Sequence, residues 1–196
     1  MKKLLVLVAL VSVAWFYFHD ADGEWRGIPA ARDPQQISSG LPRPFHHDDH
    51  LITPLARYSI TAVVLSRSRY RNDTAASFAP VDLALGWGPM SVAGVINDLN
   101  ISQSGRWYEY SWSGAAPLDP GEIARHSANT HCLPATPEVR KRLLAVKRHE
   151  LVSLNGYLVE VSNTDGYRWR SSLSRDDTRG GACEIMWITS VESRKL

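Results

Sequence analysis

The stretch Leu151-Val152-Ser153-Leu154-Asn155-Gly156-Tyr157-Leu158-Val159-Glu160-Val161 carries the strongest local structural signal in the chain. Two β-prone runs flank an Asn-Gly pair, and both residues of that pair readily take a positive φ. A type I′ turn needs a positive φ at both of its central residues, so the pattern predicts a β-hairpin that turns at Asn155-Gly156. The core is therefore expected to contain antiparallel sheet.

Further strands and short helices are expected around this hairpin. Runs of β-branched or aromatic residues predict strands over residues 57–65, 106–112, 167–173 and 182–191. Apolar spacing and capping patterns predict two or three short helices, over 91–99, 119–126 and 137–146. Glycine and proline interrupt the apolar block 79–90, which is expected to form a tight buried loop. We predict an α+β fold with a curved, mainly antiparallel sheet or a small barrel.

The first eighteen residues predict a transmembrane helix that anchors the chain. Lys2 and Lys3 precede an apolar run that ends in four aromatic residues. At about 1.5 Å per residue, residues 1–18 span roughly 27 Å, just enough for a hydrocarbon core of about 30 Å. Ser12 and Ala14, the small residues that a cleavage site would need, lie inside the run, so the anchor is expected to be retained. Basic residues stay on the cytoplasmic side of a membrane. We therefore expect the anchor to cross a bacterial inner membrane once, with the rest of the chain in the periplasm.

The remaining chain divides by composition into a tether and one domain. Residues 19–56 are rich in proline and glycine and lack apolar periodicity, so they predict a tether, with the periplasmic domain over 57–196. The tether carries a net charge of −3 and the domain one of +3. Neither value indicates binding to nucleic acid. The consecutive residues 46–50 (His-His-Asp-Asp-His) are all of metal-ligating types, but on a tether they are not preorganised, so no metal site and no cofactor is expected.

The two cysteines predict a disulfide. Cys132 and Cys183 lie 51 positions apart and have no zinc-type spacing. In an oxidising compartment the default expectation is a bond between them, which would stabilise the fold by roughly 4 kcal/mol. A free catalytic thiol is the alternative.

A polar segment holds the candidate catalytic residues. Ser127, Asn129 and His131 alternate, so they project to one side of an extended segment, and a histidine beside a hydroxyl is the minimum for base-assisted nucleophilic attack. The disulfide would bring a second hydroxyl and an acid near His131. The candidates for these roles are Ser171, Ser172 and Asp176, with Arg175 beside them.

Other residues are candidates for binding. Asp82 lies inside an apolar block, so its carboxylate must be paired or must accept backbone N–H groups. Trp87, Trp107, Trp112 and Trp169 are candidates to line a groove for a sugar or a peptide, although aromatic residues in strands more often fill the core. Asn129 and Arg175 complete this set of candidate binding residues.

Several sequence blocks resemble those of a known group of proteins. These blocks are Pro80-Val81-Asp82-Leu83-Ala84-Leu85-Gly86-Trp87-Gly88-Pro89-Met90-Ser91, His126-Ser127-Ala128-Asn129-Thr130-His131, Gly156-Tyr157-Leu158-Val159 and Trp169-Arg170-Ser171-Ser172-Leu173. They are similar to an uncharacterised group of single-pass proteobacterial envelope proteins, over roughly residues 57–190. The resemblance implies a location and no activity.

Two functions are compatible with these patterns. The first is a membrane-anchored periplasmic domain that binds or scaffolds an envelope partner, either a protein or a cell-wall ligand. The second is an envelope hydrolase that uses His131 with a nearby serine. A solvent-accessible hydroxyl within about 3.2 Å of a ring nitrogen of His131 would favour the hydrolase.

The topology can be tested with fusions at the C-terminus of the full chain. Alkaline phosphatase is expected to be active there, and a fluorescent protein that matures only in the cytoplasm is expected to stay dark, because Lys2 and Lys3 precede the apolar run. A fluorescent, phosphatase-negative C-terminus would contradict the predicted orientation.

Overall fold

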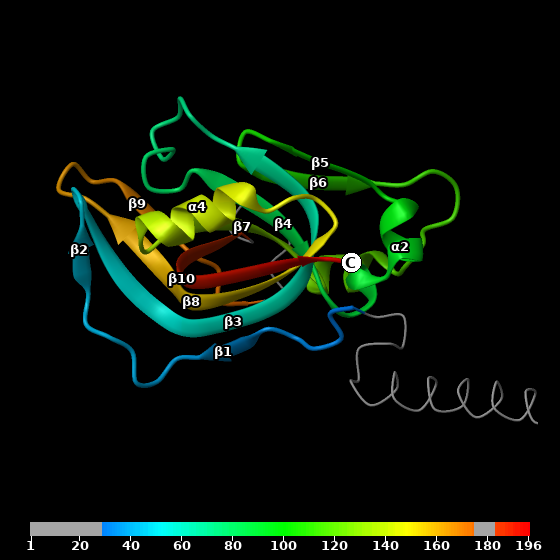
Figure 1. Ribbon diagram of the computed structural model, residues 1–196, viewed down its shortest axis with the longest axis horizontal. Coiled ribbons are helices and arrows are strands. Elements are labelled where there is room, and N and C mark those ends of the chain that lie inside the picture. The colour runs from blue at the N-terminus through cyan, green and yellow to red at the C-terminus, as the bar shows by residue number, and fades with distance from the viewer. Residues whose placement is uncertain (1–28, 175–182) are drawn as a thin grey trace, which may run out of the picture.

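The protein folds around a ring of five β-strands. The computed structural model describes residues 29–174 and 183–196 (Figure 1). The ring consists of β3 (His50–Arg69), β4 (Val81–Gly86), β7 (Ser127–Pro134), β10 (Glu184–Lys195) and β8 (Glu150–Ser162). β3 pairs with both β4 and β8, so the pairing closes on itself. β7 and β10 run parallel, and the other neighbours in the ring run antiparallel. The predicted α+β fold with a curved, mainly antiparallel sheet is confirmed.

Shorter elements surround the ring. They are β1 (Gln35–Ile37), β2 (Phe45–His47), η2 (Gly88–Ser91), α2 (Ala93–Asn97), β5 (Asn100–Ser104), β6 (Trp107–Ser111), α3 (Pro120–Arg125), α4 (Pro137–Ala145) and β9 (Arg168–Arg170). β1 and β2 pair with β3, and β9 pairs with β8. β5 and β6 form a separate two-stranded hairpin. Among the described residues no helix is long and apolar enough to cross a membrane, and the predicted anchor lies outside them.

Two apolar clusters lie on opposite sides of the ring strands. Met186 of β10 packs in the larger cluster, whereas its neighbours Ile185 and Trp187 pack in the second. Successive residues of a strand face opposite sides of the sheet. The larger cluster takes residues from all five ring strands and therefore fills the ring. The second cluster lies outside the ring and covers part of its outer face.

The helix α4 forms where the sequence predicts it. The hydroxyl of Thr136 accepts a hydrogen bond from the backbone N–H of Val139, at 3.2 Å, and so caps the first turn. Val139 and Leu143 are buried on the same face of the helix. The helix packs by this face against β7 and β10.

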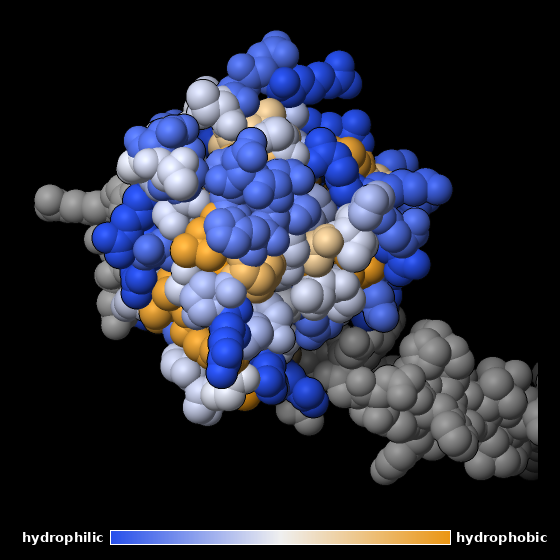
Figure 2. Space-filling model, turned by 90° about the vertical axis from the view of Figure 1, so that its left-hand side faces the viewer, coloured by the Kyte–Doolittle hydropathy of each residue, from blue (hydrophilic) through white to orange (hydrophobic). Residues whose placement is uncertain are grey.

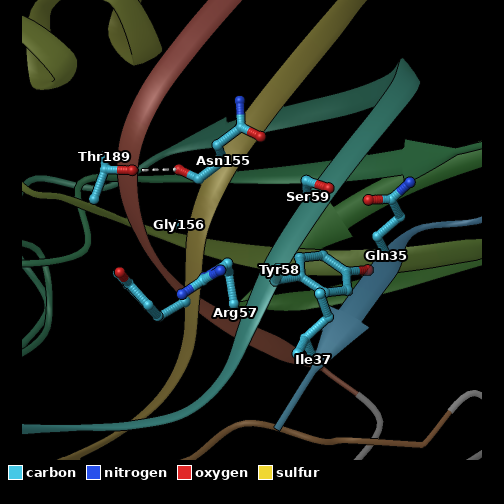
Figure 3. A pocket seen from close by; sticks show the side chains of 9 residues that line it. Gln35, Ile37, Arg57, Tyr58, Ser59, Asn155, Gly156 and Thr189 are labelled. Carbon is cyan, nitrogen blue, oxygen red and sulfur yellow. Dashed lines mark hydrogen bonds between the residues drawn. The ribbon is translucent and has the colours of Figure 1, made fainter. Parts of the chain in front are cut away.

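The predicted hairpin at Asn155-Gly156 is wrong. Both residues lie inside β8, which runs without a break between β3 and β10 (Figure 3). Gly156 does not have a positive φ. It is required for a close approach, because a Cβ at this position would lie 1.9 Å from the backbone carbonyl oxygen of Trp187. Pairing along both edges of β8 outweighs the local preference of Asn-Gly for a turn.

The turn with positive φ occurs instead between β5 and β6. Its central residues are Gly105, with φ 55°, and Arg106, with φ 67°. Ser104 and Trp107 pair across it. A left-handed conformation costs a non-glycine residue roughly 1–2 kcal/mol. The contacts that hold Arg106 in this conformation must therefore compensate for it.

Two further expectations are wrong. Residues of the block 79–90, expected to be a buried loop, form β4, and the strand shows no alternation because it is buried on both faces. Part of the expected tether is sheet, because β1, β2 and the start of β3 lie upstream of Arg57. The histidine-rich segment 46–50 forms the hairpin that joins β2 to β3. Within the described part of the chain, no three His, Cys, Asp or Glu side chains converge as a metal site requires.

The role of Gly156 can be tested by Gly156→Ala. The new methyl group meets backbone atoms of β10 rather than a movable side chain, so we expect the free energy of unfolding to fall by about 3 kcal/mol or more. Urea denaturation of the full chain measures this. Gly94→Ala is the matched control: a Cβ there meets no atom within 4 Å, and alanine in α2 should stabilise by about 0.5–1 kcal/mol. Equal effects of the two substitutions would contradict the close approach.

Candidate functional site

β4 and β7 place an acid and a histidine opposite each other on the outer face of the ring. The register pairs Asp82 with His131. Asp82 is fully buried, and His131 is 3% exposed. The Nδ1 atom of His131 lies 2.9 Å from Oδ2 of Asp82, although the two atoms are not aligned as a hydrogen bond. Because Nδ1 faces the carboxylate, Nε2 is the ring nitrogen that remains for other contacts.

Arg106 joins this pair from the turn between β5 and β6. Its Nη1 donates to Oδ1 of Asp82 at 3.1 Å. Its Nε and Nη2 donate to the two carboxylate oxygens of Asp73, at 2.7 and 2.8 Å, and Nη2 also donates to the carbonyl of Ala79. A buried carboxylate is costly unless a cation or hydrogen bonds compensate it. We call Asp73, Arg106, Asp82 and His131 the charged network.

The pairing shifts the pKa values within the network. Burial acts against the charged form of Arg106, but the hydrogen bonds with Asp73 and the charge of Asp82 outweigh it and raise the pKa of Arg106. The hydrogen bonds from Arg106 lower the pKa of Asp73. Asp73 therefore stabilises the folded state above its unfolded pKa of about 3.9, and this contribution is lost as the pH falls through the lower folded value.

Neighbouring side chains hold the network in place. The guanidinium of Arg106 lies 4.0 Å from the centre of the Tyr70 ring, and burial raises the pKa of that tyrosine. The ring of His131 packs against Trp169, with 4.4 Å between the centroids. Asn129 donates from Nδ2 to the backbone carbonyl of Arg106 at 2.9 Å. The hairpin β5–β6 is thus fixed to β4 through the side chain of Arg106 and to β7 through its backbone carbonyl.

The network opens on a pocket of about 420 Å³. Ionisable residues in its lining include Asp73, Arg106 and His131, and aromatic residues are Trp107, Tyr167 and Trp169. The pocket therefore combines polar groups with aromatic rings at one point, as ligand sites usually do.

A second pocket, of about 210 Å³, has a different character. It lies beside β1, β3, β8 and β10 (Figure 3). Its floor includes Gly156, and Thr189 donates a hydrogen bond to the carbonyl of Asn155 at 3.0 Å. Arg57 is the one charged residue in its lining. The first pocket is the better candidate because ionisable groups converge there.

The structure brings together five of the residues singled out in the sequence: Asp82, Trp107, Asn129, His131 and Trp169. Ser127, Asn129 and His131 do share one face, because all three lie in β7. Trp87 lies apart from the pocket, where it is buried and donates from Nε1 to Asp33. Arg175 and Asp176 lie outside the described residues.

The candidate serines bond to the backbone rather than to His131. The hydroxyl of Ser127 donates to the carbonyl of Ile123 at 2.7 Å. Those of Ser171 and Ser172 donate to backbone carbonyls at 2.8 and 3.0 Å. The hydroxyl of Ser171 also accepts from the N–H of Ile185. These bonds give the three hydroxyls structural roles.

The predicted disulfide is absent, and Cys132 and Cys183 are both free thiols. Cys132 points into the ring, where it is fully buried, and burial raises its pKa well above the usual value. Cys183 lines the pocket on the other side, with its sulfur 3.9 Å from Nδ2 of Asn129. Burial raises the pKa of Cys183 as well. The strand alternation separates the two sulfurs, because Asn129 and Cys132 face opposite sides of β7.

Sequence reasoning missed Arg106, Asp73 and Tyr70. The signal for Arg106 was its place after Gly105, where a polar turn precedes an aromatic strand. That signal indicates a turn but says nothing of which buried acid the arginine meets. Comparisons with protein-family models, with curated proteins and with solved structures found no match.

The network can be tested by removing its cation. Arg106→Ala leaves the carboxylate of Asp82 buried without its partner, so we expect the free energy of unfolding to fall by about 3–5 kcal/mol in urea denaturation. Adding Asp82→Asn removes the stranded charge and should recover part of the loss. Arg142→Ala, which breaks an exposed ion pair on α4, is the control and should change stability by less than about 1 kcal/mol. A double variant less stable than Arg106→Ala would contradict the pairing.

Proposed function

We propose that the protein is a membrane-anchored periplasmic binding module, which takes an envelope partner or a cell-wall ligand at the pocket beside the charged network. One observation carries the proposal: ionisable and aromatic side chains from five separate segments converge on one pocket. Large aromatic side chains that serve only stability are usually buried in the core. Trp107, which lines this pocket, is instead 53% exposed.

The strand order supports a binding role by analogy. If the ring strands β3, β4, β7, β8 and β10 are numbered 1 to 5 along the chain, their order around the ring is 1-2-3-5-4. Strands 3 and 5 are parallel. Five-stranded Greek-key barrels of the OB type bind ligands on the face of strands 2 and 3, flanked by the loops 1–2 and 4–5. In this protein Asp82 lies on strand 2 and His131 on strand 3. Asp73 lies in the loop between strands 1 and 2, and Trp169 lies in the connection between strands 4 and 5. This is an analogy of architecture, which supports a place for a ligand rather than its identity.

The bonding of the site favours binding over hydrolysis. A serine hydrolase needs a hydroxyl poised at the histidine, whereas Ser127, Ser171 and Ser172 donate to backbone carbonyls. Arg106 is held by two carboxylates and a carbonyl, so it acts as a fixed wall of the pocket. A rigid, preorganised wall lowers the entropy cost of binding.

The location in the envelope rests on the sequence. Residues 1–18 have the charge and length of an anchor, and the blocks around Asp82, His131 and Trp169 carry the resemblance to single-pass envelope proteins. Each of these three blocks contributes a residue to the site.

Photo-crosslinking in living cells tests the proposal. The full chain carries p-benzoylphenylalanine at position 107, on the pocket, or at position 37 as a matched control. Ile37 is also an exposed apolar residue, at 47%, but it lines the second pocket. We expect an adduct with an envelope protein or with cell-wall material from position 107 and not from position 37. The same adducts from both positions, or none from position 107, would contradict the proposed site.

A further inference from the structure

The open part of the pocket is aromatic. Trp107 stands at the tip of the hairpin β5–β6 with half of its surface exposed, and Tyr167 and Trp169 lie across the pocket from a different segment. Trp169 is held by packing on His131. Rings fixed in this way offer flat faces at little cost in conformational entropy.

The cation of the pocket is already committed to partners within the protein. A guanidinium has five N–H donors. Four bonds from Arg106 go to Asp73, Asp82 and the carbonyl of Ala79. An incoming phosphate or carboxylate would have to compete with two carboxylates that hold the same cation. Nucleic acid binding relies on free Arg and Lys at the phosphates, so the site is poorly suited to it.

The polar groups of the pocket that remain available to a ligand can form hydrogen bonds with hydroxyl groups. Nε2 of His131 faces away from Asp82, and the side chain of Asp73 is 38% exposed. The thiol of Cys183 lies in the same lining. A hydroxyl both donates and accepts, so it can bond to a carboxylate and to an imidazole without bringing a net charge into the pocket.

The surrounding surface is broken up rather than broadly apolar. Figure 2 shows the end of the molecule where β2 and β9 lie, and its apolar areas are divided by hydrophilic ones. A large flat protein interface would present a continuous apolar centre. The pocket with its aromatic rim fits a narrow ligand that enters it.

We propose that the pocket binds an uncharged saccharide chain, with sugar rings stacked on Trp107 and Trp169 and sugar hydroxyls bonded to Asp73 and His131. This inference rests on the proposed function and names its ligand class. Sugar rings present an apolar face and a hydroxyl rim, which matches the aromatic platforms and the polar wall of this pocket.

Isothermal titration calorimetry on the full chain in detergent micelles tests the inference, with chitotetraose, cellotetraose and maltotetraose as probes. We expect at least one of the three to bind, with an affinity that Trp107→Ala reduces roughly tenfold and Ile37→Ser leaves unchanged. Trp107 is exposed, so its substitution should not prevent folding. Trp169→Ala should also weaken binding, provided that circular dichroism shows it to be folded.

Alkylation of Cys183 gives a second readout. Cys132 is fully buried, so N-ethylmaleimide should modify Cys183 first in the native protein, and the bound tetrasaccharide should slow this reaction. Binding of none of the three tetrasaccharides, binding that Trp107→Ala does not weaken, or binding of a fifteen-nucleotide poly(dT) in their place would overturn the inference. A protein adduct from position 107 together with no saccharide binding would refute the saccharide and leave the proposed binding site standing.

Discussion

The buried carboxylate of Asp82 is the constraint on which the site depends. Removing a charge from water costs several kcal/mol, and this cost must be offset locally. Arg106 offsets it, but its side chain reaches Asp82 only from a turn in which the residue itself takes a positive φ. The hairpin β5–β6 is thereby fixed on the outer face of β4 and β7, and the aromatic side chain of Trp107 is placed at the mouth of the pocket.

The closed ring of strands creates this arrangement. Antiparallel pairing of β4 with β7 places Asp82 opposite His131, and parallel pairing of β10 with β7 brings Cys183 beside Asn129. Alternation along the strands then sends one set of side chains into the core and the other to the site. The same alternation keeps Cys132 in the core, away from the pocket, so the two thiols cannot serve one site.

Part of the site follows from local pattern. The alternation of Ser127, Asn129 and His131 indicated a shared face, and Asp82 inside an apolar block indicated a buried partner. Arg106 and Asp73 did not emerge, because they lie 24 and 9 positions from Asp82 on turns whose packing has no periodic signature. The prediction that Ser171 and Ser172 lie near His131 depended on a disulfide between Cys132 and Cys183. Without that bond, the hydroxyls of Ser171 and Ser172 bond to backbone groups, including the N–H of Ile185 on β10.

The sequence by itself determined the elements whose stability is local. The helix α4 has its cap and its apolar face within one segment, and the strand β6 has its aromatic alternation, so both form where the pattern predicts them. Tertiary structure decided what Asn155-Gly156 does and where β4 runs. A turn preference is worth about 1 kcal/mol, whereas a strand that is paired along both edges gains hydrogen bonds and packing from segments far away in the chain. Those segments supply most of the free energy that stabilises β8. Its conformation therefore follows from pairing with its neighbouring strands and not from local propensity.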